Sequence, residues 1–361
     1  MLGYKYRFSL GLFTILWTAV YLMQKTSYNN HYYLLILVCL IMLLLPASNY
    51  ASLDVKNNPE IKQNTMPRWC SFVMIFQVAI VYFFATLAKF YPGWLDGSFT
   101  KLILSNTEFE VFKKLFTQHW FHLFIAYSGI AFDMLIIPLL LWKRTRTIAF
   151  LSAVFFHLFN AIFLQIGIFP FFALSFIVFF YPPEKIRSIF FRKKIPVEYA
   201  APIAQKKAAL LYFFLPFFII QLILPIRHHF IKGDVLWTEE GHRLSWRMML
   251  RQRQGYATFR VIDKKSQTEI PYDYLKKLNQ KQQAFVASNP DGIWQMAQII
   301  KKEFAQKGTD VSVFVNAEAS INGGKYNKLV NPETDMATAK WDYFFHNDWI
   351  LLYDAQGNIL K

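Results

Sequence analysis

Residues 73–88 read VMIFQVAIVYFFATLA, an apolar stretch interrupted only by Gln77 and Thr86. Such a stretch has the composition of a membrane-spanning helix, which needs about 20 mostly apolar residues. Lys89 follows it directly, and the chain continues as KFYPGWLDG over residues 89–97. The stretch therefore predicts a membrane helix that ends at a lysine.

Lys89 allows two interpretations. A lysine at the end of a membrane helix usually extends its apolar stem so that the ammonium reaches the lipid headgroups. A lysine held in a dry site loses the hydration of its ammonium, so its neutral amine can act as a base near neutral pH. The position alone favours the first interpretation, and the motifs described below favour the second.

The composition places most of this chain in a membrane. Of its 361 residues, 55% are hydrophobic and 19% are aromatic, and the mean hydropathy is +0.24. These values are too apolar for an ordinary soluble domain. The long apolar runs lie in residues 1–226, whereas residues 227–361 have a mixed composition. We therefore expect a polytopic α-helical membrane bundle of about six segments over 1–226, followed by a small soluble, β-rich α+β domain over 227–361.

The net charge of +16 does not indicate a nucleic-acid partner. Much of the positive charge lies in segments next to apolar runs, at residues 143–146, 185–194 and 206–207. Such clusters are typical of cytoplasmic loops or of contacts with anionic lipid, and no RNA-binding motif accompanies them. Cys39 and Cys70 lie in or beside apolar runs, which predicts buried thiols and no disulfide. The N-terminal apolar run lacks a cleavage site, so we expect a retained membrane segment.

Six apolar stretches are candidate spans: residues 8–23, 32–45, 72–88, 121–142, 147–181 and 208–225. The fifth is too long for one helix and holds Gly167 and Pro170 near its middle. We expect a broken pair of helices there, over 147–165 and 169–181. Broken backbone at membrane depth survives only where it is buried in protein or lines a cavity.

Polar residues inside the spans are candidates for function. Asp133 lies in the middle of one span, and His157 and Asn160 lie three apart on one helical face. Ionisable groups at membrane depth face the bundle interior and mark functional sites; the alternative is that they are satisfied structural groups. The polar block KTSYNNH at residues 25–31 separates the first two spans, where its asparagines could also cap the next helix.

The C-terminal part shows signals of a small mixed domain. Alternating apolar residues predict strands at 256–262, 311–319 and 349–354, with a return strand at 267–271. Turns are expected at 263–266 and 321–324. Residues 292–306 predict an amphipathic helix that presents Ile293, Ala297 and Ile300 on one face. The sequence holds no Walker loop, GxGxxG, CxxC, HExxH or GxSxG motif and no cluster with metal-ligand spacing.

Four stretches in the same order carry a resemblance to one family. The first is KTSYNNHYYL at 25–34, and the second is IVYF at 80–83 leading to Lys89 and WLDG at 94–97. The third is FHLFN at 156–160 with IGIF at 166–169, and the fourth is LWT at 236–238 with Gly241 and LSWRMM at 244–249. Two shorter matches are SIN at 320–322 and NP at 331–332. The chain resembles the vitamin K-dependent γ-glutamyl carboxylases and their bacterial relatives, which share the horizontally transferred transmembrane (HTTM) domain. It departs from them in Tyr28, where the family has Trp. We also expect it to be a bacterial-type homologue that lacks the family's first helices and stops soon after the β-rich part.

The resemblance implies a chemistry and a set of site residues. In the family, an active-site lysine deprotonates a reduced vitamin K, and the anion reacts with O2 to give a strong base that removes a γ-proton of glutamate, after which the carbanion captures CO2. Lys89 matches the catalytic base. Asn30 and His31 match a polar pair that would bind the quinone oxygens, with a catalytic role in stabilising the anion. His157, Asn160 and Trp94 are further cofactor-binding candidates. The implied cofactors are reduced vitamin K or a related quinol, O2 and CO2, with no metal.

Three functions remain open from the sequence. The first is a carboxylase, a carbon–carbon lyase of the peptidyl-glutamate 4-carboxylase type, acting on a Glu-containing protein or peptide. The second is an HTTM membrane protein with other quinone- or lipid-linked chemistry, or with a role in peptide maturation or export. The third is a non-enzymatic, peptide-binding membrane module. We expect a multi-pass protein of the bacterial inner membrane, in contact with lipid and not with nucleic acid. The resemblance implies that residues 227–361 lie on the non-cytoplasmic side, as in the family.

Overall fold

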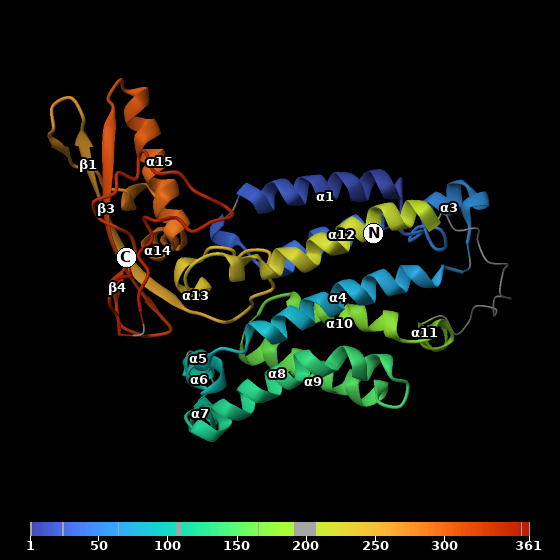
Figure 1. The fold of residues 1–361 in the computed structure, drawn as a ribbon. Helices are drawn as coiled ribbons and strands as arrows, with labels where there is room; N and C mark the ends of the chain where they lie inside the picture. Colours follow the sequence, from blue (N-terminus) through green and yellow to red (C-terminus); the bar gives the residue numbers. More distant parts are fainter. Residues whose placement is uncertain are drawn as a thin grey trace. The chain divides into compact units, whose positions relative to one another are not determined.

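The computed structural model describes residues 2–23, 25–63, 65–105, 110–164, 166–190, 207–354 and 356–360. The chain forms two compact units, Met1–Leu222 and Ile223–Lys361. The first consists of helices, and the second holds an antiparallel sheet with helices (Figure 1). The expected fold class, a helical membrane bundle followed by a small α+β domain, is confirmed. Gln165, residues 191–194 and Lys206, which the sequence predictions included, lie outside the described residues.

The long helices of the first unit follow the predicted apolar stretches, and shorter helices that were not predicted lie between them. In chain order they are α1 (Tyr6–Met23), η1 (Lys25–Ser27), α2 (Asn30–Leu44), α3 (Leu53–Asn57), η2 (Pro59–Ile61), α4 (Arg68–Ala88), α5 (Pro92–Leu95), α6 (Ser98–Ser105), η3 (Glu110–Phe112), α7 (Lys113–Phe116), α8 (His119–Leu141), α9 (Arg146–Phe163), α10 (Phe169–Ser175), η4 (Phe176–Phe180), α11 (Pro183–Phe190) and α12 (Lys207–Ile226). The last turn of α12 belongs to the second unit and leads into η5 (Arg227–Phe230).

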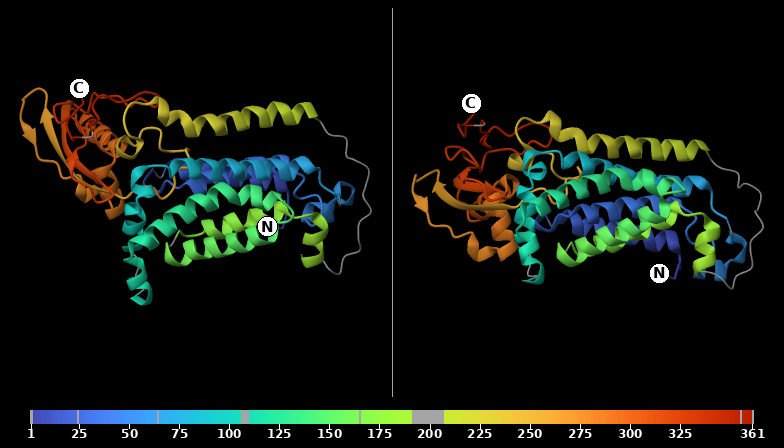
Figure 2. Two further views of the ribbon diagram at one scale, coloured as in Figure 1. Left: turned by 60° about the horizontal axis from the view of Figure 1, so that its bottom comes forward. Right: turned by 90° about the horizontal axis from the view of Figure 1, so that it is seen from below.

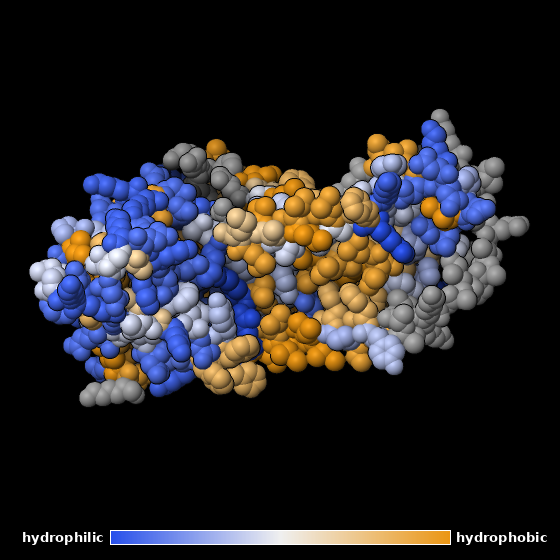
Figure 3. All heavy atoms as spheres, turned by 90° about the horizontal axis from the view of Figure 1, so that it is seen from above, coloured by the Kyte–Doolittle hydropathy of each residue, from blue (hydrophilic) through white to orange (hydrophobic). Residues whose placement is uncertain are grey.

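Within the described residues, five helical stretches are long and apolar enough to cross a membrane. They are α1, α4, α8, α9 and the stretch Leu211–Phe230, and the shorter α2 and α10–η4 are also apolar. Large hydrophobic side chains are exposed along them, for example Leu16 on α1 and Phe155 on α9. On the face drawn in Figure 3, hydrophobic residues form a broad region in the middle part of the picture. Such a surface suits contact with lipid chains.

The break expected in the fifth apolar stretch is present. Helix α9 ends at Phe163, Gly167 adopts a left-handed φ of +68°, and α10 starts with Pro170 in its first turn. Proline is favoured at that position because its missing N–H has no helical partner there. Within the unit, α4 packs against α8 and η4, α8 packs against α9, and α9 packs against α10 (Figures 1 and 2). The break therefore returns the chain along α9 and brings α10 into the bundle.

The second unit is built on a four-stranded antiparallel sheet. Its elements are α13 (Val235–Thr238), β1 (Arg253–Asp263), β2 (Glu269–Ile270), η6 (Leu275–Lys277), α14 (Gln280–Ser288), α15 (Pro290–Gln306), β3 (Val311–Ile321) and β4 (Asn327–Lys328), with sheet order β2-β1-β3-β4. Arg253 pairs with Ile321 at one end of the central ladder and Asp263 with Val311 at the other. Alternate residues of β3, such as Val313 and Val315, are buried in the same core cluster as Ile293 and Ile300 of α15.

One predicted strand is wrong. Residues 349–354 form no strand and take part only in two isolated bridges, Val330 with Ile350 and Tyr353 with Ile359. Trp349 and Ile350 are nevertheless buried in the core of the unit. Their apolar character therefore reflects packing of an irregular segment, which the alternation pattern cannot distinguish from a strand. Helix α14 was not predicted, because its nine residues carry little apolar periodicity.

Candidate functional site

Lys89 is buried in an ion pair with Asp133. Lys89 ends α4, and its Nζ lies 2.5 Å from Oδ2 of Asp133 in the middle of α8. The two side chains are only 10% and 8% exposed. Nζ also donates to the carbonyl of Ala85 at 3.3 Å, one turn back along α4. The amine thus points back into the bundle, and the side chain does not extend beyond the helix end.

Trp94 covers the same amine. Its ring centroid lies 5.4 Å from Nζ of Lys89, a distance at which a cation is attracted to the ring face. The indole Nε1 donates to the carbonyl of Ala126 on α8 at 3.0 Å, which fixes the ring. Gly129, one turn further along α8, lies beside the indole, and a Cβ there would make an ordinary van der Waals contact of 3.5 Å with its Cζ2. The turn between α4 and α5 therefore folds an aromatic ring over the ion pair.

A second polar pair joins α4 to α9. The hydroxyl of Tyr82 lies 3.0 Å from Nε2 of His157. Tyr82 precedes Lys89 by two helical turns, about 10 Å along α4. Phe132, the neighbour of Asp133 in α8, contacts the rings of both Tyr82 and His157, at centroid distances of 6.1 and 5.6 Å. The two polar pairs consequently belong to one packed region between α4, α8 and α9.

The two histidines predicted for the site meet at one aromatic ring. The imidazole of His31, from α2, stacks on Phe169 of α10 with centroids 4.0 Å apart, and His157 meets the same ring edge-on at 5.9 Å. Nδ1 of His31 and Nδ1 of His157 are buried and have no hydrogen-bond partner among the described residues. An unpaired buried polar atom costs about 1–3 kcal/mol, so such a pair points to a bound group that completes the hydrogen bonds.

The two predicted asparagines, Asn30 and Asn160, differ in burial. Asn30 is buried at the start of α2, where its Oδ1 accepts a hydrogen bond from the hydroxyl of Tyr28 at 2.9 Å. Its neighbour Asn29 caps the helix by accepting from the backbone N–H of His31 at 2.8 Å. Asn160 is half-buried one turn beyond His157 on α9. The capping role expected for this block thus falls on Asn29, which leaves Asn30 and His31 inside the bundle.

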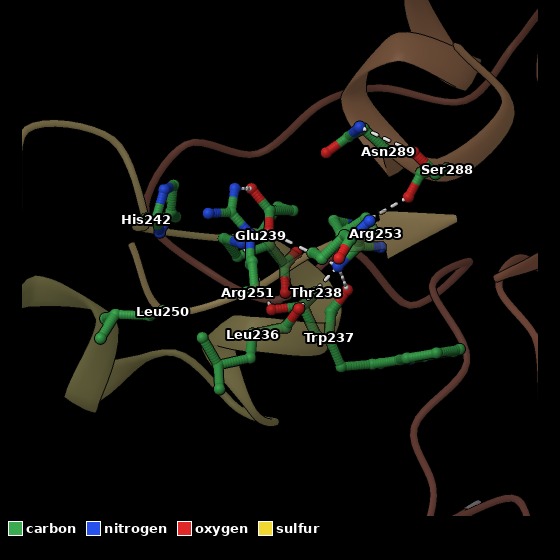
Figure 4. Close-up of polar contacts among 12 residues, drawn as sticks. Leu236, Trp237, Thr238, Glu239, His242, Leu250, Arg251, Arg253, Ser288 and Asn289 are labelled. Carbon is green, nitrogen blue, oxygen red and sulfur yellow. Dashed lines mark hydrogen bonds and ion pairs between the residues drawn. The ribbon is translucent and has the colours of Figure 1, made fainter. Parts of the chain in front are cut away.

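The second unit holds a buried arginine cluster (Figure 4). Arg253, at the start of β1, donates through Nη1 to the carbonyls of Leu236 and Trp237 at 2.6 and 2.9 Å and through Nε to the carbonyl of Ser288 at 2.8 Å. Burial lowers the pKa of this guanidinium to about 10. Its Nη2 is buried without a partner among the described residues. Sequence reasoning missed this residue, because a single arginine at the start of a strand carries no pattern.

Glu239 is the acidic centre of this cluster. Its carboxylate forms a two-pronged ion pair with Arg251 and lies 3.4 Å from Nη1 of Arg253 (Figure 4). Glu239 also terminates α13 in the left-handed conformation, with φ +63°. Nearby, Nη2 of Arg243 forms an ion pair of 2.8 Å with Asp291. The cluster is thus a network of arginines with fewer carboxylates, held by backbone carbonyls.

The segment HRLSWRMM, residues 242–249, passes beside this cluster with an unusual backbone. Leu244, Trp246 and Met249 all have positive φ, of 61°, 57° and 51°. Non-glycine residues in this region are strained, and such strain concentrates at functional sites. Burial, followed by the surrounding arginines, lowers the pKa of His242 well below its usual value, so this imidazole is neutral at physiological pH. Trp246 is fully buried. The strained segment is therefore a second candidate site.

Two comparisons with protein families match the two parts of the chain. Residues 1–184 match the family model of the HTTM domain. Residues 206–356 match the lumenal domain of vitamin K-dependent gamma-carboxylase. No solved structure matches the chain. Within the described residues, no group of three or more His, Cys, Asp or Glu side chains could hold a metal ion.

Proposed function

We propose, from the premise that this chain belongs to the HTTM-domain family, that it is a quinol-dependent carboxylase of protein glutamate. The family resemblance seen in the sequence motifs is confirmed, and the chain is a gamma-carboxylase-like, integral multi-pass membrane protein. The proposal adds the reaction: oxygenation of reduced vitamin K or a related quinol, coupled to carboxylation of a Glu-containing peptide by CO2. The observation that carries it is the buried pair of Lys89 and Asp133.

The pair can act as one base, because both Nζ of Lys89 and Oδ2 of Asp133 can bind a proton. A buried ammonium alone is strongly penalised, whereas a paired ammonium and carboxylate are neutral together. With a quinol hydroxyl against Nζ, the ammonium of Lys89 would pass one proton to Asp133 across the 2.5 Å contact and would take the hydroxyl proton in its place. Lys89 then remains an ammonium and stabilises the oxygen anion beside it. Lys89 is therefore the group that meets the quinol, and Asp133 is the final proton acceptor.

The surrounding residues fit a flat ring that carries oxygen atoms. His31 stacks on Phe169 and His157 meets the same ring edge-on, and the unpartnered Nδ1 atoms of both imidazoles offer hydrogen bonds to such a ring. Asn30 precedes His31 and extends the polar edge. A bound quinol would supply the electrons that reduce O2. Trp94 excludes water from the amine of Lys89, which protects a strong base from quenching.

The second unit is the proposed peptide-binding part. Five arginines lie at positions 227, 243, 247, 251 and 253, and an acidic peptide would be attracted to this charge. Arg251 and Arg253 are already held by Glu239, so they are pre-organised, whereas Arg243 retains some exposure. Pre-organised cations favour binding because little side-chain freedom is lost. The match of this part to the lumenal domain supports the same assignment.

Assay of the purified protein in bilayers tests the proposal. The assay contains reduced vitamin K, O2, labelled bicarbonate and a Glu-rich peptide, and it compares the wild type with Lys89→Ala. Lys89-dependent label in the peptide supports the carboxylase. Lys89-dependent epoxide without label supports other quinone-linked chemistry on the same site. Peptide binding without either product supports a non-enzymatic peptide-binding module.

We also propose that the second unit faces the non-cytoplasmic side, where secreted substrates pass. Ser266, exposed in the turn between β1 and β2, suits a single introduced cysteine. A membrane-impermeant thiol reagent should label Ser266→Cys in right-side-out vesicles. Labelling only after the membrane is opened would contradict this orientation.

A further inference from the structure

The second unit exposes three consecutive aromatic side chains. Tyr343, Phe344 and Phe345 form a loop, and their exposed fractions are 66%, 76% and 71%. Exposed apolar residues in a run are unfavourable in a water-soluble surface unless they serve a contact. Contiguous apolar patches of this kind mark protein or membrane interaction sites. The loop therefore requires a partner.

Hydrogen bonds hold the loop in this exposed form. Oδ1 of Asp342 accepts from the backbone N–H groups of Phe344 and Phe345 at 2.8 and 3.0 Å. Asn347 closes the loop from the other side: its Oδ1 accepts from the N–H of Asp342 at 2.7 Å, and its Nδ2 donates to the carbonyl of Asp342 at 3.1 Å. Because both ends are fixed, the aromatic side chains stay at the tip and do not collapse onto the unit.

The closing residue Asn347 is attached to a buried carboxylate. Its backbone N–H and its Nδ2 both donate to Oε1 of Glu240 at 2.8 Å. The neighbouring His346 places Nδ1 2.7 Å from Oε2 of the same carboxylate. Glu240 is itself almost fully buried. The aromatic loop is thus held by hydrogen bonds to the buried side chain of Glu240.

The backbone next to Glu240 packs against η5, the segment that ends the last candidate span. Gly241 follows Glu240, and a Cβ added at Gly241 would lie 2.9 Å from Cα of His228. His228 belongs to η5, the end of the apolar stretch Leu211–Phe230. Phe230, the last residue of that stretch, is 80% exposed. All of these residues belong to the second unit. The aromatic loop is therefore linked, within one unit, to the residues that end the last candidate span.

The chemistry of the loop favours lipid over an acidic or basic partner. Aromatic side chains are enriched at the membrane–water boundary, where their rings sit at headgroup level. The nearest exposed charges along the chain are Lys340 and Asp348, which have opposite signs, and Asp342 is engaged within the loop. Along the described residues on either side of the loop, no run of like charges is present that would favour a charged peptide or anionic lipid.

We propose that Tyr343, Phe344 and Phe345 insert into the headgroup region of the same membrane that the stretch Leu211–Phe230 crosses. The second unit is then attached to the bilayer at two places, by its connecting helix and by the aromatic loop. Its orientation on the lipid surface is fixed by both. The inference does not depend on the proposed reaction, and its test does not use activity.

Fluorescence quenching by lipid tests the insertion. The full chain, with Cys39→Ala and Cys70→Ala, receives one cysteine at Phe344→Cys that carries an environment-sensitive fluorophore. It is reconstituted in phosphatidylcholine bilayers with and without nitroxide-bearing lipids. Ser266→Cys, exposed in the same unit at the far end of β1, serves as the matched control. We expect quenching several-fold stronger at position 344 than at position 266, and unchanged by added salt.

Two results would overturn the inference. One is equal quenching at positions 344 and 266. The other is a probe at position 344 that ignores the lipid but changes its emission when a Glu-rich peptide is added, because the loop would then be a peptide surface. A second variant, with Tyr343→Ser and Phe345→Ser around the labelled position, should lose most of the quenching. All the substituted loop residues are exposed, so the fold is retained.

Discussion

Lys89 and Asp133 join α4 to α8 through a buried contact of 2.5 Å between Nζ and Oδ2. The contact changes the expectation drawn from the sequence, in which a lone lysine amine serves as the base. The amine has a carboxylate as its partner at this distance, so proton transfer from a quinol is assigned to the pair. Two predictions concern this contact and its surroundings, and two concern the second unit.

Removal of one member of the pair should be more damaging than removal of both. Asp133→Asn leaves a buried ammonium without its partner, which destabilises a protein by about 3–5 kcal/mol. Lys89→Met with Asp133→Leu removes both charges and should restore most of the stability, since apolar replacements of buried pairs are often neutral. Thermal unfolding in detergent measures both effects. Equal melting temperatures for Asp133→Asn and the wild type would show that the pair does not hold the helices.

Tyr82→Phe should reduce quinol turnover while the protein stays folded. The change removes the hydroxyl that pairs with Nε2 of His157 and leaves this imidazole with both nitrogens unpartnered. The lost hydrogen bond corresponds to about 1–3 kcal/mol. Tyr127→Phe, at an exposed position on α8, is the matched control. A quinol KM and kcat that are unchanged in Tyr82→Phe would exclude this imidazole from the site.

Stability of the second unit should fall in mild acid because of His242. Its folded pKa lies well below its unfolded value of about 6.5, so only the unfolded chain gains a proton just below that pH. The contribution of this residue is complete above about pH 6.5 and is lost as the pH falls, by up to about 1.4 kcal/mol per unit. The pH dependence of the melting temperature should flatten in His242→Gln and stay unchanged in His119→Gln, an exposed control. A wild-type melting temperature independent of pH over this range would contradict the assignment.

Gly241 should tolerate a side chain much less well than Gly323. Both have left-handed φ angles, +72° and +74°, so a Cβ introduces a similar backbone penalty of about 1–2 kcal/mol. A Cβ at Gly241 would also come within 2.8 Å of Cβ of His228, whereas nothing lies within 4 Å of one at Gly323. Gly241→Ala should therefore lower the melting temperature more than Gly323→Ala. Equal losses would show that His228 does not pack against this turn.

Local patterns predicted the elements of the fold well. The apolar runs marked the helices, Gly167 with Pro170 marked the break before α10, and alternation marked β1 and β3. The pattern failed at residues 349–354, because buried Trp349 and Ile350 produce the same signal in an irregular segment. Sequence periodicity reports burial, and it reports hydrogen-bonded pairing only indirectly.

The sequence indicated several residues of the candidate site, but it did not indicate which of them contact one another. Asp133 was conspicuous as an acid at membrane depth, but 44 positions separate it from Lys89, and no local pattern joins them. Tyr82 was hidden, because its ring counts as apolar in a membrane stretch while its hydroxyl pairs with His157. Arg253 and Glu239 meet through the strained turns around residues 239–249, whose backbone no propensity predicts. Contacts between distant elements required the structure.

The most direct test is the formation of vitamin K epoxide and labelled peptide by wild type and by Lys89→Met with Asp133→Leu, both reconstituted in bilayers and both shown to be folded. The double variant is the appropriate comparison because it removes the base without leaving a buried charge. We predict both products from the wild type and neither from the double variant. Undiminished epoxide formation by the folded double variant would contradict the central claim that this pair accepts the proton of the quinol.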